Sequence, residues 1–145
     1  MTPQTMGILV GGIAPAFAYA LFALWTKSSN QAGIGPGPFL MCLGVGCALV
    51  GAVFSMVLPA TWNTKSVMHA LAAGVVWAVG TGLVSLALAR FGTPLSRLVP
   101  LYNTNTLIAV LLALVVFAEW KQVQPWPLLG GAVLILAGSL LVARA

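Results

Sequence analysis

Five consecutive residues with hydrogen-bonding side chains precede a long apolar run. They are Tyr102, Asn103, Thr104, Asn105 and Thr106. Residues 107–118, which follow, carry no polar side chain. Amides and hydroxyls donate and accept hydrogen bonds without being strong nucleophiles or bases, so this cluster suits the binding of a small polar ligand.

On a helical wheel the polar residues of this segment surround the helix instead of forming one stripe. At about 100° per residue, Arg97 and Thr104 share a face, Tyr102 and Asn105 lie to one side, and Asn103 lies opposite them. A helix that is polar all round cannot face lipid at that depth. It is either enclosed by protein or not a regular helix.

Pro100 favours an interrupted helix. Its ring displaces the carbonyl of Ser96, which kinks or breaks the turn. Broken helices are tolerated in membranes where they line a cavity or are buried in protein. The alternative is that the cluster only bonds neighbouring helices together, a common use of Asn and Thr in membranes. We favour a polar cavity, because such bonding rarely needs five polar residues, a proline and an arginine together.

A second polar face is predicted on the helix over residues 66–90. Small and polar residues recur there at three- and four-residue spacing around one indole: Gly74, Trp77, Ala78, Thr81, Gly82, Ser85 and Ala89. Trp77 at mid-helix is a candidate stacking surface for a ligand, with core packing as the alternative. In the first helix, Gly12, Pro15 and Tyr19 form a thinner version of this face, with a kink expected at Pro15.

The residues needed for enzymatic chemistry are missing. Glu119 is the only acid, so no carboxylate pair exists, and His69 stands alone. Cys42 and Cys47 are about 140° apart around a helix, which makes neither a disulfide nor a metal pair. We therefore expect no catalytic residues, no metal site and no cofactor. Glu119 is assigned a possible role in gating or coupling, with a salt bridge to Lys121 as the plainer alternative.

Composition decides where these segments reside. Of 145 residues 61% are hydrophobic and 5% are charged, whereas a soluble domain has about 25% charged residues. The net charge of +5 comes from cations spread singly along the chain, which form no patch for nucleic acid. The lipid bilayer is the expected partner.

Five apolar stretches are long enough to cross a bilayer, which takes roughly 20 residues each. We place them at 5–26, 37–58, 66–90, 95–118 and 126–143. Gly- and Pro-rich breaks separate them, among them "TKSSNQAGIGPGP" and "EWKQVQPWP". The fold class predicted is an all-α integral membrane protein, with residues 1–145 as a single five-helix domain.

The cations give a weak orientation signal. With five spans the termini lie on opposite faces of the membrane. Two cations, Lys65 and Lys121, fall on the N-terminal side, and four fall on the other: Lys27, Arg90, Arg97 and Arg144. The excess places the C-terminus in the cytoplasm. So small an excess is also what a protein inserted in both orientations requires.

The chain resembles one EamA-type half of the drug/metabolite transporter superfamily. The likeness rests on five helices, the "TP" entry to the fourth, Pro100 within it, Glu119 ending it, and "WPLLGGAVLILAGSLLV" as the fifth. It covers the whole chain and is strongest over residues 75–142. The stretch "YNTNTLIAVLLALVVFAEWK" is similar to the sugar-porter branch. Most members have two inverted five-helix repeats, so the resemblance implies that two copies of this single repeat assemble around one pore.

The chain departs from the related small multidrug exporters. Those depend on a glutamate embedded in the first helix, where this chain has Tyr19 and no acid. A cation in a low dielectric needs a carboxylate partner. Export of cationic drugs is therefore disfavoured, and Arg97 points toward neutral polar or anionic ligands.

The sequence thus predicts a multi-pass protein of the cell inner membrane that transports a small polar metabolite, sugar-like or anionic. We expect it to act by alternating access as an antiparallel homodimer, with Gly131 and Gly138 at the contact. The predicted substrate-binding residues are Tyr19, Trp77, Thr81, Arg97, Tyr102, Asn103 and Asn105. Two alternatives remain open: a non-transporting membrane subunit that packs against a partner, and a small exporter of hydrophobic or cationic compounds.

Overall fold

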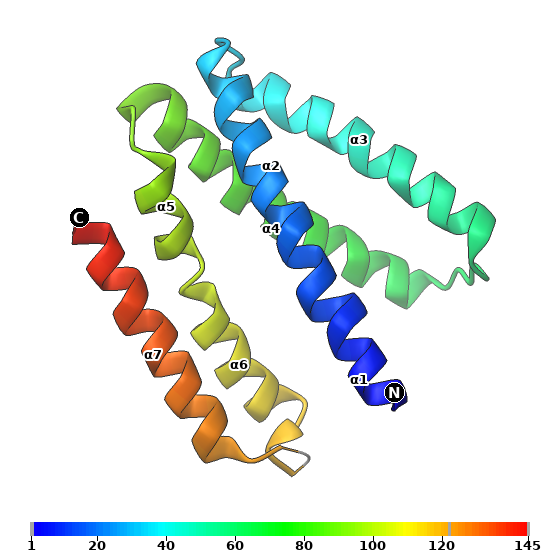
Figure 1. Cartoon of the computed structure of the whole chain (residues 1–145). Helices are drawn as coiled ribbons and strands as arrows, with labels where there is room; N and C mark the ends of the chain where they lie inside the picture. Colours follow the sequence, from blue (N-terminus) through cyan, green and yellow to red (C-terminus); the bar gives the residue numbers. More distant parts are fainter. Residues whose placement is uncertain (1, 122, 145) are drawn as a thin grey trace. The chain divides into compact units, whose positions relative to one another are not determined.

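A computed structural model of the chain describes residues 2–121 and 123–144. This part of the chain folds into helices joined by short turns. The helices form two compact units, Met1–Gly92 and Thr93–Ala145. Each unit is described by itself, and Figure 1 traces the helices of both.

The first span of the Met1–Gly92 unit changes helical type twice. It consists of α1 (Pro3–Ile8), the π-helix η1 (Leu9–Ile13) and α2 (Ala14–Gln31). Pro15 has no N–H to give to the carbonyl one turn before it, and the Ala14 N–H bonds to the Leu9 carbonyl five residues back. The distortion expected around Pro15 is thus a wider turn directly before it.

A helical hairpin follows, made of α3 (Pro36–Val57) and α4 (Thr64–Phe91) (Figure 1). Asn63 caps the start of α4, because its side-chain oxygen accepts a hydrogen bond from the Ser66 N–H at 2.9 Å. Gly92 ends α4 in the left-handed conformation, with φ of 59°, which glycine adopts without a Cβ clash. These signals bound a helix of 28 residues, long enough to cross a bilayer.

α4 packs against both α2 and α3. α3 approaches α4 tightly at Gly82, where an added Cβ would lie 3.1 Å from the Leu40 Cδ1 atom. Gly44 and Gly51 of α3 and Gly74 of α4 have open space at the Cβ position. No other described helix of this unit therefore approaches closely at these three positions.

The Thr93–Ala145 unit contains α5 (Leu95–Tyr102), α6 (Asn105–Val116), the 3-10 turn η2 (Glu119–Lys121) and α7 (Pro125–Arg144). α5 and α6 together form the fourth span, and α7 packs alongside both (Figure 1). Leu95 of α5 and Ala132 of α7 are buried. This unit is thus a helical hairpin, and its first helix is interrupted between α5 and α6.

Among the residues that the structure describes, five helical segments are long and apolar enough to span a membrane, as predicted. Their bounds are Thr5–Gln31, Pro36–Val57, Thr64–Phe91, Leu95–Val116 and Trp126–Arg144. Four of the five agree closely with the ranges expected from the sequence. The first does not: it was expected to end at residue 26, and it continues five residues further, to Gln31.

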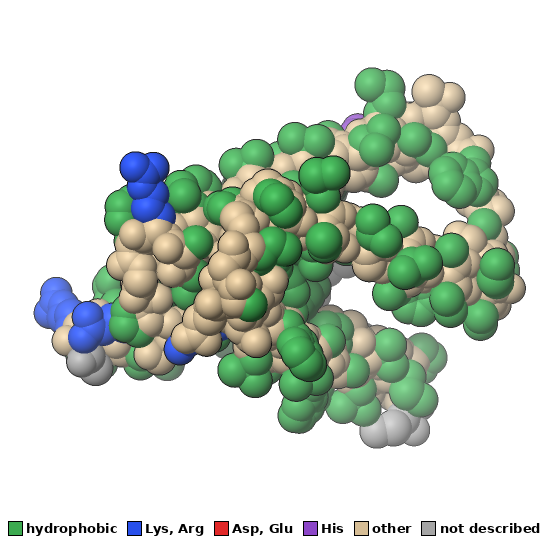
Figure 2. Space-filling view, turned by 90° about the horizontal axis from the view of Figure 1, so that it is seen from above, with side chains coloured by type: hydrophobic (Ala, Val, Ile, Leu, Met, Phe, Trp, Pro, Cys, Tyr) green, Lys and Arg blue, Asp and Glu red, His purple; other side chains and the backbone are tan. Residues whose placement is uncertain are grey.

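Burial in this protein is inverted relative to a soluble domain. Large apolar side chains point outward along the spans, and Figure 2 shows them over much of the visible face. In the described part of the chain, the buried side chains include five polar ones: Thr26, Asn30, Thr81, Ser85 and Ser139. Lipid as the surrounding solvent explains this pattern, since polar groups then need partners inside the protein.

Candidate functional site

Two stripes of side chains with matching spacing face each other across α2 and α4. Each stripe has one residue every four positions: Phe22, Thr26 and Asn30 on α2, and Trp77, Thr81 and Ser85 on α4. Phe22 meets Trp77 at one end and Asn30 meets Ser85 at the other. Asn30 is eight residues after Phe22, and Ser85 is eight residues after Trp77. Because both numbers rise toward the same end, the two helices run in the same direction here. We call these six residues the α2–α4 ladder.

The end of the ladder at Asn30 and Ser85 is closed. The Ser85 hydroxyl donates to the Asn30 Oδ1 atom at 2.7 Å, and the Asn30 Nδ2 atom donates to the Thr26 carbonyl at 2.8 Å. The Thr26 hydroxyl in turn donates to the Phe22 carbonyl at 2.8 Å. The exposed fraction of Ser85 is 0%. Each polar side chain in this series of hydrogen bonds therefore already has a partner within the protein.

Small side chains make this contact possible. Ala23 and Thr26 on α2 and Ser85 on α4 let the two backbones approach, as is usual between membrane helices. Thr26 and Asn30 each bond to a carbonyl four residues back, which satisfies them without leaving the helix. The Ser85–Asn30 bond then joins the two helices and fixes their register.

The other end of the ladder is partly exposed, and we call it the open end. The ring centroids of Phe22 and Trp77 are 6.1 Å apart at an interplanar angle of 39°. Trp77 keeps 45% of its surface exposed, and Phe22 is half-buried. This tilted aromatic pair lies within the preferred range for ring contacts and leaves part of the indole free.

Thr81 lies at the middle level of the ladder, between the open and the closed ends. Its side chain is 8% exposed. Within residues 2–121 and 123–144, no hydrogen bond from its hydroxyl is found, and no fully enclosed side-chain oxygen or nitrogen lacks a partner. The Thr81 oxygen therefore retains a small accessible surface. It is a nearly buried hydroxyl that is free to bond.

The fourth span is interrupted at its polar cluster. α5 ends at Tyr102 and α6 begins at Asn105, with Asn103 and Thr104 in a turn between them. There the backbone N–H groups of Thr104 and Thr106 bond to carbonyls three residues back, at 3.1 and 3.0 Å. Pro100 led us to predict an interrupted helix, and this segment is indeed not one regular helix. The break lies three residues after the proline, not in the turn before it.

Thr104 helps to form the break. Its hydroxyl donates to the Leu101 carbonyl at 2.6 Å, and the Thr104 N–H bonds to the same carbonyl. Two donors on one carbonyl hold the chain in the tighter turn. Asn103 and Asn105 flank this turn and are exposed, whereas Tyr102 and Thr104 are half-buried. The two amides are thus presented by an interruption and not by opposite faces of one straight helix.

The remaining predicted residues lie apart from these features within their units. Tyr19 of α2 is 67% exposed and takes no part in the ladder. Arg97 of α5 is exposed, and Glu119 is the exposed first residue of η2, two positions before Lys121. The structure thus places Trp77 and Thr81 on one face of α4, and Tyr102, Asn103 and Asn105 around one break.

Three residues of the ladder, Phe22, Thr26 and Asn30, were missed from the sequence. Thr26 and Asn30 belong to "TKSSNQAGIGPGP", which we interpreted as a connection because of its Ser, Asn, Gly and Pro residues. The helix instead continues to Gln31, and the chain turns at Gly33, with φ of 92°. The four-residue spacing of Phe22, Thr26 and Asn30 continues the helical period past the point where we ended it. That spacing was the available signal.

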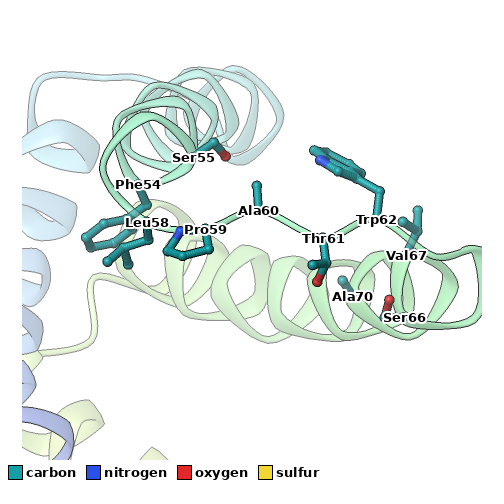
Figure 3. Close-up of a pocket in the computed structure, with 10 residues that line it drawn as sticks. All are labelled: Phe54, Ser55, Leu58, Pro59, Ala60, Thr61, Trp62, Ser66, Val67 and Ala70. Carbon is teal, nitrogen blue, oxygen red and sulfur yellow. The ribbon is translucent and has the colours of Figure 1, made fainter.

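A surface hollow of about 450 Å³ lies where α3 meets the connection to α4 (Figure 3). Its walls are open, and Trp62 stands on the opposite side of Ala60 from Phe54 and Leu58. Trp62 is 80% exposed, as expected of a tryptophan at the end of a span, in the interfacial zone of a membrane. The described residues contain no cluster of His, Cys, Asp or Glu that could hold a metal ion.

Comparison with known proteins gives one informative similarity. The chain is 27% identical over 132 residues to a curated Lactobacillus helveticus protein named "Putative sugar uptake protein". The alignment covers 90% of this chain and 45% of that protein, so the chain spans less than half the length of its relative. No family model matches the chain, and no solved structure matches it.

Proposed function

We propose that this chain is a membrane carrier that takes up a small, sugar-like solute. The observation that carries the proposal is the similarity to the sugar uptake protein, which extends over 90% of the chain. Five helices of spanning length and composition agree with a carrier, because such proteins place their substrate sites between membrane helices.

The interrupted fourth span supports a binding role for its polar cluster. Non-helical backbone at membrane depth is tolerated only where it is buried in protein or lines a water-filled cavity. Asn103 and Asn105 are exposed at such a break, next to half-buried Tyr102. Their amides and the phenol offer both donors and acceptors to the hydroxyls of a sugar. Arg97 of α5, also exposed, is a further candidate contact.

We further propose that two five-helix repeats make the working carrier, as a homodimer that alternates its access between the two sides of the membrane. The relative is about twice as long as the stretch that aligns, which agrees with a second repeat in that protein. In α7, both Gly131 and Gly138 have open space at the Cβ position, so this face is free to approach another helix. An antiparallel arrangement in the inner membrane remains the form that we favour.

The purified protein in liposomes provides the test. We expect it to exchange neutral aldoses across the membrane in counterflow, with saturable rates and no exchange in protein-free liposomes. In the same preparation, cysteines placed at Lys27 and Lys65 should each react with an impermeant reagent from both sides if the protein is inserted in both orientations. Absence of exchange for every sugar tried, with the protein folded and dimeric, would favour a non-transporting subunit instead.

A further inference from the structure

We propose that the open end of the α2–α4 ladder is a subsite for the ring of a neutral sugar, in which the ring face stacks on Trp77 and a ring hydroxyl bonds to Thr81. This inference rests on the proposed function and narrows its substrate class from sugar-like solutes to uncharged cyclic sugars. The subsite lies entirely within the Met1–Gly92 unit.

The first argument is the free hydroxyl of Thr81. The Thr81 side chain is 8% exposed, and its hydroxyl oxygen keeps a small accessible surface without a hydrogen-bond partner among the described residues. Most hydroxyls in so enclosed a place have a partner, so this one is available to a ligand. Its neighbours on the ladder, Thr26 and Ser85, both have partners. Asn30 and Ser85 bond to each other at the closed end, so we place the ligand hydroxyl on the Trp77 side of Thr81.

The second argument is the indole one turn before it. Trp77 and Thr81 are four residues apart on α4, so their side chains are neighbours on one face of the helix. Trp77 retains 45% exposure, and its contact with Phe22 restricts how its ring can turn. A sugar ring has an apolar face of C–H groups and a polar rim of hydroxyls. An aromatic face with a hydroxyl one turn away matches both parts.

The third argument is charge. None of the six ladder residues is ionisable, and a charged ligand between membrane helices needs an opposite charge to offset its desolvation. Lys27, which is half-buried, is adjacent to Thr26 in sequence but lies about 100° around α2 from it. The ladder itself therefore favours a neutral ring over a sugar acid.

Asn30 and Ser85 have a positioning role in this arrangement. Their hydrogen bond sets the register of α2 against α4, and that register places Phe22 beside Trp77 eight residues away. Removing a single hydroxyl from Thr81 or from Ser85 should therefore have different effects. Removing the Thr81 hydroxyl should affect ligand affinity, whereas removing the Ser85 hydroxyl should affect the stability of the helix pair first.

The test is equilibrium binding of radiolabelled neutral aldoses to the full chain in lipid nanodiscs, using a panel of aldohexoses and aldopentoses. For the sugar that binds best, we expect competition by other cyclic aldoses. We expect little competition by mannitol, which is an open chain, or by glucuronate, which is charged. Thr81→Val should weaken binding by roughly ten- to a hundredfold, because the ligand hydroxyl loses its partner in a nearly dry site.

Matched variants separate the subsite from effects on folding. Thr81→Ser keeps the hydroxyl and should bind nearly as the wild type does, and Trp77→Phe should retain more affinity than Trp77→Leu. Thr61→Val and Trp126→Leu make the same changes at exposed positions and should leave binding unchanged. Every variant is compared with the wild type by size-exclusion profile and melting temperature, so that unfolded protein is recognised.

The outcomes also separate this inference from the proposed function. Binding that depends on Thr81 and Trp77, without transport in liposomes, would support the subsite and contradict the carrier. Sugar transport that is unchanged in Thr81→Val and Trp77→Leu would support the carrier and overturn the subsite. Stronger binding of glucuronate or mannitol than of any neutral aldose, or no binding of any aldose, would also overturn it.

Discussion

The closed end of the α2–α4 ladder and the break between α5 and α6 both place amides and hydroxyls in apolar spans, but they satisfy them differently. At the ladder, Asn30 and Ser85 are buried and bond to each other across two helices. At the break, Asn103 and Asn105 are exposed and the helix itself is interrupted. One region uses its polar groups internally, and the other presents them outward.

This difference indicates how polar residues in a membrane helix can be sorted by their partners. A polar side chain that is bonded to a neighbouring helix contributes to packing, and its loss should lower stability. A polar side chain beside interrupted backbone and without such a bond is available to a ligand, and its loss should lower affinity. The type of residue does not distinguish the two roles, because both regions use asparagine.

The largest effect on stability is expected at Ser85. Ser85→Ala leaves the buried Asn30 Oδ1 atom without its donor, so the free energy of unfolding should fall by about 1–2 kcal/mol. The matched control is Ser55→Ala. Ser55 is exposed on α3 and donates only to the Gly51 carbonyl of its own helix, so the change should stay within about 0.5 kcal/mol.

Melting temperatures or denaturant titrations in detergent would measure both serine variants. The contrast between the two regions fails if Ser55→Ala destabilises the protein as much as Ser85→Ala does. In that case the bond between the helices would carry no more weight than a bond within one.

A smaller effect is expected at Thr104, inside the break. Thr104→Val removes the hydroxyl that donates to the Leu101 carbonyl, and the turn should lose about 0.5–1 kcal/mol of stability. Thr106→Val, two residues further, is the control, since no side-chain hydrogen bond of Thr106 is found within the described residues. Faster hydrogen exchange at residues 103–106 in Thr104→Val alone is the expected measurement. Equal exchange in both variants would show that the hydroxyl does not hold the turn.

The sequence predicted the fold class well because apolar length is a strong signal. Four of five spans agree closely with their expected ranges, since Pro and Gly mark their ends and about 20 apolar residues fill them. An interruption of the fourth span was predicted from Pro100 and from the all-round polarity of residues 102–106, but its place was not. Pro100 lies inside α5, and the break follows at Asn103 and Thr104.

The ladder could be predicted only in part. The α4 side was visible as the stripe that contains Trp77, Thr81 and Ser85. The α2 side was missed because Thr26 and Asn30 were assigned to a loop by their polarity. Polar side chains indicate a loop only when they have no hydrogen-bond partner inside the protein. Asn30 has one, because Ser85, 55 residues away in sequence, donates to it. Such a long-range pairing has no local signature.

The central claim is that Asn103 and Asn105, at the break between α5 and α6, bind the ligand. The measurement is uptake of a neutral aldose into proteoliposomes. It compares the double variant Asn103→Leu/Asn105→Leu with Asn30→Leu, which changes an asparagine of the ladder. We expect the double variant to keep its melting temperature but to lose roughly ten- to a hundredfold in apparent affinity, and Asn30→Leu to lose stability first. A double variant that transports with unchanged affinity would contradict the account and leave the polar cluster of the fourth span a role in packing alone.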